Sequence, residues 1–430
     1  MNVRSGERTT VQLIGGAKKK YGLETYCLFV PRFSARPDEI PQARYAVLEP
    51  VEQNEDAPAG TGWVPVRSLL REKVLAPPED FGLRNCFEEL ERHIAQPSQS
   101  PFAKPGWIRE LSKWTQSQIE PLDLQLTGKF TQLNAGPSFS LIRMETTGPA
   151  VWFKATGGRN FNEFPIICTL ARLIPSYLAE LIGVRPHWNG WLSRECDGET
   201  LDALSDVAAW VRTADTLARL EIASIGKSRE LLDCGCRDRT VKALAPCIDD
   251  FLARIQKRMR LQLSNPPAIL ANPELAFLAD ELKHACSSLD QLGLPDVLGH
   301  LDFNPGNIVV SSEKCAFLDW SEGSVVEPFV TFCYLREHAV RTLGGAAETQ
   351  ARIVRAYLEP WQSLLSPRQT SRAMALSSIV AVFAYALAVD EQTSPGATES
   401  PASAGFLRSL ARRMHREATE IHQKSEQCRR

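Results

Sequence analysis

Pairs of cysteines at metal-ligand spacing are missing from this 430-residue chain. Its eleven cysteines are scattered between Cys27 and Cys428 without a Cys-x-x-Cys pair. The closest two, Cys234 and Cys236, have no second pair to complete a zinc site. This absence argues against a structural zinc module. An odd number of cysteines without a regular framework is typical of a reducing compartment, so we expect a cytoplasmic protein.

A strong charge of one sign is also missing. The formal net charge is −2, and because a nucleic-acid surface demands a basic excess, we expect no nucleic-acid partner. Residues 1–20 are polar and lack the apolar core of a signal peptide. Residues 373–389 form an uncharged stretch at the short limit for spanning a membrane. We expect them to be a buried helix of a large helical region and expect no membrane partner.

The composition, with 43% hydrophobic and 23% charged residues, is that of an ordinary soluble globular protein. The chain is long enough for two or three domains. Residues 1–95 contain short strand-like runs at 25–30, 45–48 and 63–66, followed by a helical pattern at 84–94. They predict a small α+β accessory domain. Residues 96–127 are interpreted as a Pro-rich linker, at 96–106, followed by a helix.

A small β-rich lobe is predicted at residues 128–198, and a large helical lobe at residues 199–430. In the small lobe the hydrophobic pattern favours strands at 128–133, 138–145, 150–155, 177–181 and 190–196, with a helix at 162–173. In the large lobe it favours long helices at 330–342, 346–364, 368–389 and 406–423.

The most informative segment runs from Gly299 to Trp320 and contains two short apolar strands. Residues 307–310 and 315–318 have the pattern of a hairpin whose turn is 311–314. Folding it about its centre places residue 307 opposite residue 318, so Asn307 and Asp319 are predicted to lie at the same end. An amide oxygen and a carboxylate are hard ligands, which suit Mg²⁺.

Asp302 lies five residues before Asn307, across an Asn-Pro-Gly turn. A carboxylate at this position is suited to accept a proton from an alcohol that approaches a metal-bound nucleotide. Simpler interpretations remain open. His300 could be structural and serve to hold the loop, Asn304 and Asn307 could be turn formers, and Asp302 could cap a helix, although Phe-Asn-Pro-Gly is a poor helix start.

The pattern of His300, Asp302, Asn307 and the Asp319-Trp320 pair resembles the aminoglycoside phosphotransferase family, bacterial relatives of protein kinases. Leu301 stands where that family usually has glycine. The resemblance implies a bilobal protein-kinase-like α+β fold that uses ATP and Mg²⁺ to phosphorylate a hydroxyl of a small molecule. Asp302 is then the base, with His300 beside it in the catalytic loop, and Asn307 and Asp319 hold the metal.

The same resemblance implies nucleotide-binding residues in the small lobe. Lys154 falls at the position of the phosphate-contacting lysine, and Glu163 is the candidate for its partner on the next helix. Lys154 could instead lie on a solvated sheet face, and Glu163 could simply complement a helix dipole. Backbone groups near Glu195 and Cys196 are predicted to contact the adenine, as the hinge between lobes.

The loop expected to cover the phosphates, residues 133–140, departs from the family because it holds a single glycine and a proline. Pro137 supplies no N–H, so Ser138 and its amide are the candidates for phosphate contact. Three functions therefore stay open: a small-molecule kinase of unspecified acceptor, a pseudokinase or nucleotide-binding scaffold without turnover, and an aminoglycoside resistance kinase. A protein kinase is disfavoured because no Ala-Pro-Glu-type segment follows Asp319. Neither the oligomeric state nor the choice between ATP and GTP can be predicted.

Overall fold

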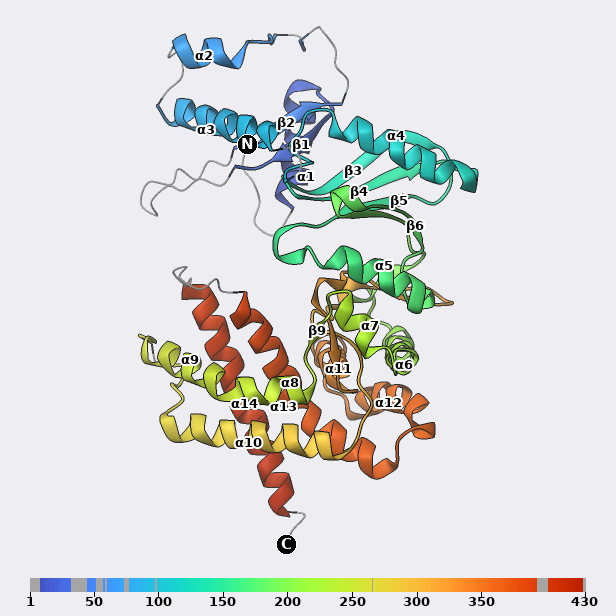
Figure 1. Ribbon diagram of the computed structural model, residues 1–430, viewed down its shortest axis with the longest axis vertical. Coiled ribbons are helices and arrows are strands. Elements are labelled where there is room, and N and C mark those ends of the chain that lie inside the picture. The colour runs from blue at the N-terminus through green and yellow to red at the C-terminus, as the bar shows by residue number, and fades with distance from the viewer. Residues whose placement is uncertain are drawn as a thin grey trace. The chain divides into compact units, whose positions relative to one another are not determined.

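The computed structural model describes residues 8–31, 45–51, 57–58, 60–72, 77–96, 99–264, 266–392 and 401–427. The chain divides into two compact units. The first, called the sheet unit, comprises Met1–Phe164 and Ala179–Glu195, and the second, called the helical unit, comprises Pro165–Leu178 and Cys196–Arg430. A β-rich part followed by a large helical part confirms the predicted α+β class (Figure 1).

The sheet unit is built on a five-stranded antiparallel sheet (Figure 1). Burial alternates along β4 and β5, as expected for a sheet with one face in the core. Val151, Phe153 and Ala155 are buried, while Lys154 between them belongs to the other face. In spatial order the strands are β3 (Leu126–Gly136), β4 (Phe139–Thr146), β5 (Val151–Ala155), β7 (Gly190–Arg194) and β6 (Leu181–Arg185).

The N-terminal elements share the core of this sheet. The main-chain N–H and C=O of Cys27 both hydrogen-bond the side-chain amide of Gln132 in β3, at 2.8 and 2.9 Å. Tyr26 and Phe29 are buried in the same cluster as Phe153. The region predicted as an accessory domain therefore forms no separate compact unit. Its elements are α1 (Thr9–Tyr21), β1 (Thr25–Phe29), β2 (Val47–Pro50), α2 (Val66–Glu72) and α3 (Pro77–Ala95).

Three local predictions differ from the structure. The Pro-rich stretch predicted as a linker buries Phe102 and Ala103 before α4 (Trp107–Ile119). No strand forms at residues 63–66, where Trp63 and Val64 are each 54% exposed and α2 begins at Val66. The strand predicted at 177–181 is wrong, because Pro175–Tyr177 forms a 3-10 turn and the strand runs from Leu181.

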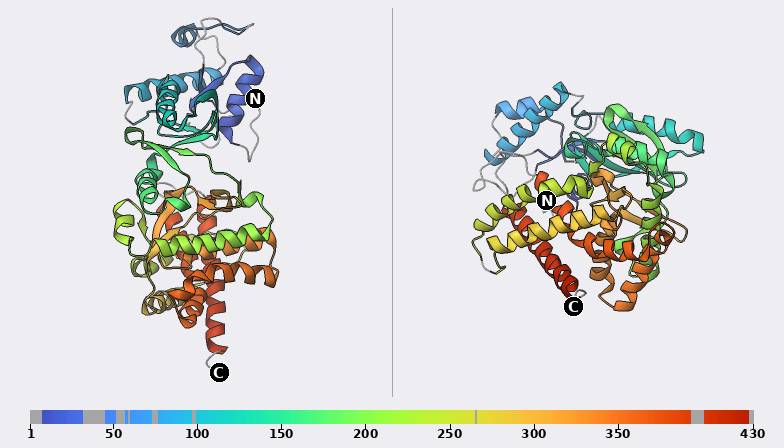
Figure 2. Two further views of the ribbon diagram at one scale, coloured as in Figure 1. Left: turned by 90° about the vertical axis from the view of Figure 1, so that its right-hand side faces the viewer. Right: turned by 60° about the horizontal axis from the view of Figure 1, so that its bottom comes forward.

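The helical unit is organised around one large apolar core. Helices α9 and α10 run side by side in Figures 1 and 2, and α10 also packs on α13 and α14. The predicted long helices are all present. The unit contains most of α5 (Glu163–Leu173), then α6 (Val207–Ala223), α7 (Ser228–Asp233), α8 (Val241–Leu244), α9 (Ile248–Arg260), α10 (Asn272–Gln291), α11 (Val330–Leu343), α12 (Ala347–Leu358), α13 (Pro367–Glu391) and α14 (Pro401–Gln427).

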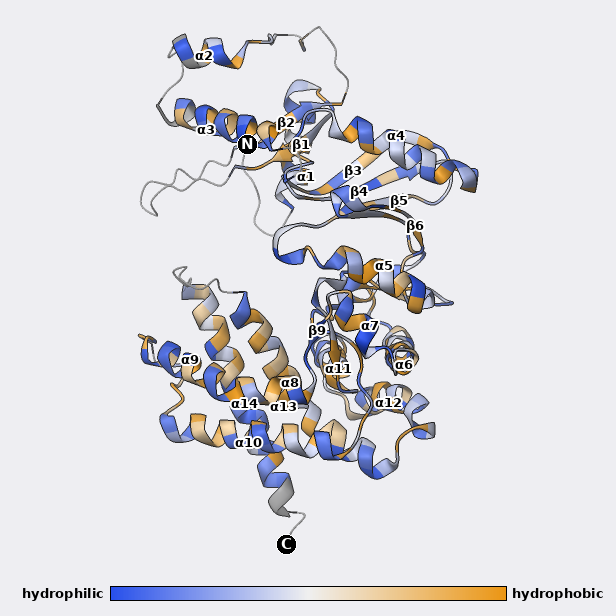
Figure 3. Ribbon diagram, in the orientation of Figure 1, coloured by the Kyte–Doolittle hydropathy of each residue, from blue (hydrophilic) through white to orange (hydrophobic). Residues whose placement is uncertain are grey.

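Helix α13 contains the uncharged stretch noted in the sequence. Among the described residues it is the one helix long and apolar enough to cross a membrane, and much of its ribbon has the apolar colour in Figure 3. However, 72% of its most apolar window is buried, and the helix packs on α10, α11 and α14. It serves as a core helix of the unit, as the sequence predicts.

Two small sheets in the helical unit position the residues of interest. One contains β10 (Val297–His300), β13 (Gly323–Val326) and β9 (Arg237–Asp238). The other contains β12 (Cys315–Phe317), β11 (Ile308–Val310) and β8 (Glu199–Thr200). The chain enters β8 through Gly198, whose φ is +112° and whose missing Cβ would lie 2.2 Å from the carbonyl oxygen of Val310. Only glycine fits this close approach.

Candidate active site

The predicted hairpin forms with the predicted register. Ile308 pairs with Phe317 and Val310 with Cys315. Just beyond the paired strands, the N–H of Leu318 donates to the carbonyl oxygen of Asn307 at 2.8 Å. Asp319 follows Leu318 directly, so the hairpin brings Asn307 and Asp319 together at one end.

Asp302 lies in the loop between β10 and this hairpin. The side chains on either side of it, Leu301 and Phe303, are each 2% exposed and anchor the loop in the core. The carbonyl oxygen of Asp302 accepts the side-chain N–H of Asn307 at 3.1 Å. Leu301 does not have a positive φ, so the glycine usual at this position in the family is not required by the backbone here.

Asn304 contributes a contact that the sequence reasoning missed. Its Nδ2 donates to Oδ1 of Asp302, and its main-chain N–H donates to the carbonyl oxygen of Asp302 at 2.8 Å. The prediction treated Asn304 as a turn former only. Its position two residues after Asp302 was the available signal, because such spacing is common for local side-chain hydrogen bonds.

His300 holds the loop from inside the core. Its side chain is buried, Nε2–H donates to the carbonyl oxygen of Leu318 at 3.0 Å, and its main-chain N–H donates to Oγ1 of Thr331 at 3.0 Å. The imidazole also packs against the Trp320 ring, with 4.8 Å between centroids. These contacts favour the structural interpretation of His300.

The environment of Asp302 makes its carboxyl a stronger base than a solvated aspartate. Burial raises its pKa above the ordinary value, and the negative charge of Asp319 raises it further. The nearby His300 and His338 act in the opposite direction. His338 lies on α11, and because it is distant in sequence from the motif, no local pattern could have indicated it.

Asn307 and Asp319 fit a magnesium ion as a donor set. Since Nδ2 of Asn307 is engaged by the Asp302 carbonyl, its Oδ1 is the amide atom suited to bind a metal. Asp319 has φ +62°, a left-handed conformation that aspartate tolerates better than most residues. In the described part of the chain, no group of three or more His, Cys, Asp or Glu could hold a metal. Two protein ligands suffice for Mg²⁺, which keeps waters and binds substrate phosphates.

The ion pair predicted in the sheet unit is present. Nζ of Lys154 on β5 lies 2.5 Å from Oε1 of Glu163, the first residue of α5. The Lys154 side chain is 23% exposed, whereas Glu163 is fully buried. Nζ also lies 5.7 Å from the centroid of the Trp191 ring. Lys154 is therefore held in place by a buried carboxylate and is not a mobile surface lysine.

The predicted phosphate loop is a tight turn. Gly136 of β3 pairs with Phe139 of β4, so only Pro137 and Ser138 connect the strands. Because proline has no N–H, Ser138 carries the one peptide N–H of this two-residue connection. A Cβ on Gly157 would lie 2.6 Å from the Ser138 carbonyl oxygen, so this glycine gives the turn its space.

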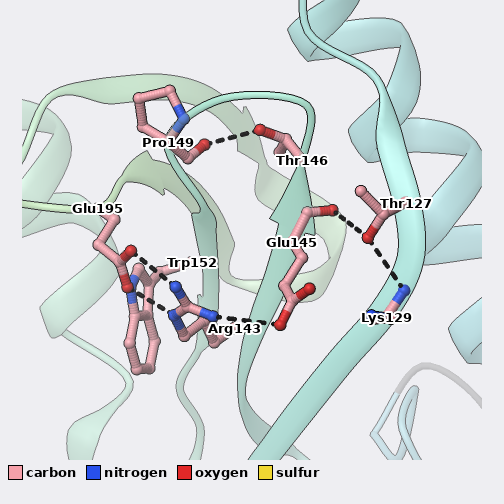
Figure 4. Close-up of polar contacts among 8 residues, drawn as sticks. All are labelled: Thr127, Lys129, Arg143, Glu145, Thr146, Pro149, Trp152 and Glu195. Atoms are coloured by element: carbon pink, nitrogen blue, oxygen red, sulfur yellow. Dashed lines mark hydrogen bonds and ion pairs between the residues drawn. The ribbon is translucent and has the colours of Figure 1, made fainter.

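The side chain of Glu195 forms its hydrogen bonds with residues of the sheet unit (Figure 4). Its carboxylate accepts two hydrogen bonds from Arg143, at 2.6 and 2.8 Å, and one from Nε1 of Trp152 at 3.1 Å. Hydrogen bonding to Arg143 lowers the pKa of Glu195. Its main-chain N–H donates to the carbonyl oxygen of Ala150. Of the main-chain groups of Glu195, the carbonyl is therefore the one that could contact an adenine ring. The last of the three points at which the chain passes from one unit to the other lies between Glu195 and Cys196, where the hinge is predicted.

No protein-family model matches the chain, and no curated protein matches it in sequence. The solved structures that it resembles include an ethanolamine kinase of Plasmodium vivax, with 15% identity over 66% of this chain and 81% of the other and a TM-score of 0.46. They also include a choline/ethanolamine kinase family protein of Mesorhizobium loti, with 16% identity over 72% and 98% and a TM-score of 0.46. An aminoglycoside 2′-phosphotransferase is a third, with 14% identity over 71% and 98% and a TM-score of 0.44.

Proposed function

We propose that this protein is a phosphotransferase that uses ATP and Mg²⁺ to phosphorylate a hydroxyl group of a small molecule. The observation that supports this most directly is the connected set Asp302, Asn307 and Asp319. One side-chain hydrogen bond joins Asn307 to Asp302, and one main-chain hydrogen bond joins Asn307 to the residue before Asp319. A base beside two oxygen ligands for a divalent metal is what phosphoryl transfer to an alcohol requires.

In this proposal Asp302 orients the acceptor hydroxyl and takes its proton. Asn304 fixes the carboxylate by its hydrogen bond to Oδ1, and His300 fixes the loop through Leu318. Asn307 and Asp319 would hold Mg²⁺, which when bound neutralises phosphate charge. Lys154, held by Glu163, would contact phosphate oxygens as a point charge. Positioning and electrostatics carry most of such a reaction.

The test is whether nucleotide binding depends on the metal. Binding is measured by a thermal-shift titration of the whole chain. ATP with Mg²⁺ should raise the unfolding temperature more than ATP alone, and Asp319→Asn should remove that increment. Asparagine is the appropriate replacement because it also tolerates a left-handed backbone. Asp233→Asn, at an exposed position on α7, is the matched control and should keep the increment. An equal response with and without Mg²⁺ in the unaltered chain would count against the proposal.

The alternative without turnover, a nucleotide-binding scaffold, makes a different prediction. It requires nucleotide binding but no loss of ATP in the presence of any acceptor. A screen of hydroxylated metabolites and aminoglycosides, with ATP consumption as the readout, separates the two and tests the aminoglycoside interpretation at the same time.

A further inference from the structure

A groove of about 1490 Å³ lies within the helical unit. It is lined by the later part of α10, the middle of α11, the first half of α13 and the later part of α14, helices that pack on one another (Figure 1). None of its residues belongs to the proposed catalytic set. Its volume exceeds the range of roughly 300–1,000 Å³ that is usual for pockets of small ligands.

Basic side chains from three helices line this groove. The carboxylates of Glu337 and Glu417 also line it. Both are ion-paired with Arg413, and Glu337 is also paired with Arg341, so two arginines neutralise the two carboxylates. Glu420 is the remaining acidic residue. The basic residues are Arg336 of α11, Arg368 and Arg372 of α13, and Arg413, Arg416 and Lys424 of α14.

Three of these cations have exposed side chains. Arg368, Arg416 and Lys424 make no ion pair with any residue that the structure describes. Arg372 is held at the groove by the ring of His284 on α10, at 3.3 Å. The groove thus presents a positive rim although the whole chain carries a formal net charge of −2.

Apolar side chains, called the floor here, also line the groove. Leu292, Met374 and Ile421 line it and pack against the core of the helical unit. Methionine adapts its shape to different partners and is frequent at such binding surfaces. An apolar floor with a charged rim suits a ligand that has an apolar face and anionic groups beside it.

We propose that this groove binds an acidic, amphipathic segment of a partner protein. Apolar side chains of the segment would cover the floor, and its carboxylates would face the arginine and lysine rim, as in other helix-in-groove recognition. A small polyanion would leave most of the volume and the apolar floor unused. The observations therefore favour a peptide segment over a phosphate-bearing small molecule.

The first test uses the unaltered full chain and two labelled peptides, with fluorescence anisotropy as the readout. The first peptide carries leucine at heptad positions a and d and glutamate at most others, and the second has lysine in place of every glutamate. The glutamate peptide should bind, with an affinity that falls as salt is raised, and the lysine peptide should not. Absence of binding by the glutamate peptide, or equal binding by both, would overturn the proposal.

The second test locates the site with charge-reversed variants. Arg368→Glu, Arg416→Glu and Lys424→Glu together should weaken binding of the glutamate peptide by about tenfold or more, since attraction at the rim becomes repulsion. The matched control also replaces three exposed basic residues by glutamate, but outside the groove, at Arg229, Arg352 and Arg355. It should reduce the affinity much less. Equal losses in both variants, or full displacement of the peptide by pyrophosphate, would contradict the assignment. Circular dichroism checks that both variants fold.

Discussion

The imidazole of His300 and the main-chain carbonyl of Leu318 are joined by a hydrogen bond of 3.0 Å. This bond ties the end of β10, which leads to Asp302, to the residue that precedes Asp319. The relative position of the proposed base and the proposed metal ligand therefore depends on a buried histidine that needs no contact with substrate.

Replacing His300 by alanine should lower the free energy of unfolding by about 1–3 kcal/mol, because the partly buried carbonyl of Leu318 loses its hydrogen-bond donor. Urea unfolding followed by tryptophan fluorescence measures the loss. His284→Ala is the control. That residue is exposed, so its replacement should change the stability by less than about 0.5 kcal/mol. An unchanged unfolding midpoint for His300→Ala would show that the bond contributes nothing.

Asp302→Asn should reduce turnover by about 10²–10⁴-fold, the usual contribution of a general base, while nucleotide binding persists. It should also raise the stability at pH 7. Because burial and Asp319 raise the pKa of Asp302, the folded state binds its proton more tightly than the unfolded state, and stability falls as the group ionises. The stability gain should disappear in acid, below the pKa of the unfolded state. Unfolding curves at several pH values, beside ATP-consumption assays, test both statements, and full activity would refute the assignment of the base.

Lys154→Met should destabilise the sheet unit by about 3 kcal/mol, because the buried carboxylate of Glu163 loses the positive charge of Lys154. Glu163→Gln should cost less, since Lys154 is partly exposed and can be solvated. The double variant Lys154→Met with Glu163→Gln should lose less than the sum of the two single losses, because no buried charge remains. Denaturant unfolding of the three variants gives the coupling free energy between Lys154 and Glu163. If the losses of the two single variants add up to the loss of the double variant, the two residues do not stabilise the fold as a pair.

The buried carboxyl of Glu221 predicts a stability that declines as the pH rises from about 4.5 to about 8. It is fully buried on α6, where burial raises its pKa to about 8, although the Tyr357 hydroxyl donates to Oε2 and favours the charged form. Since the folded pKa exceeds the ordinary 4.5, this group costs stability as pH rises from 4.5 to about 8, by up to about 1.4 kcal/mol per unit. Glu221→Gln should flatten this dependence. If the free energy of unfolding falls with pH equally in Glu221→Gln and in the unaltered protein, this prediction is wrong.

The hairpin that carries Asn307 and Asp319 could be predicted from the sequence because its information is local. Two short apolar runs and the polar turn between them fix the register, and the register fixes which residues meet. The pair Lys154 and Glu163 followed from family resemblance and not from any local pattern.

Other features depend on contacts between distant residues and could not be read from the chain. Gln132 hydrogen-bonds Cys27 across 105 positions, and this contact joins the N-terminal region to the main sheet. Arg185 is buried with its guanidinium 3.5 Å from the Trp188 ring centroid, in a strand that was predicted too early. The four-residue apolar run at 63–66 was too short to separate strand from loop, and Pro65 within it supplies no ladder hydrogen bond.

The close approach of Gly198 to Val310 has a practical consequence for mutagenesis of the segment around it. A saturation library over the segment 196–200 would lose every variant with a side chain at position 198, since even alanine would meet a main-chain oxygen and adopt an unfavourable φ. Diversity is better introduced at neighbouring positions, with that codon held constant.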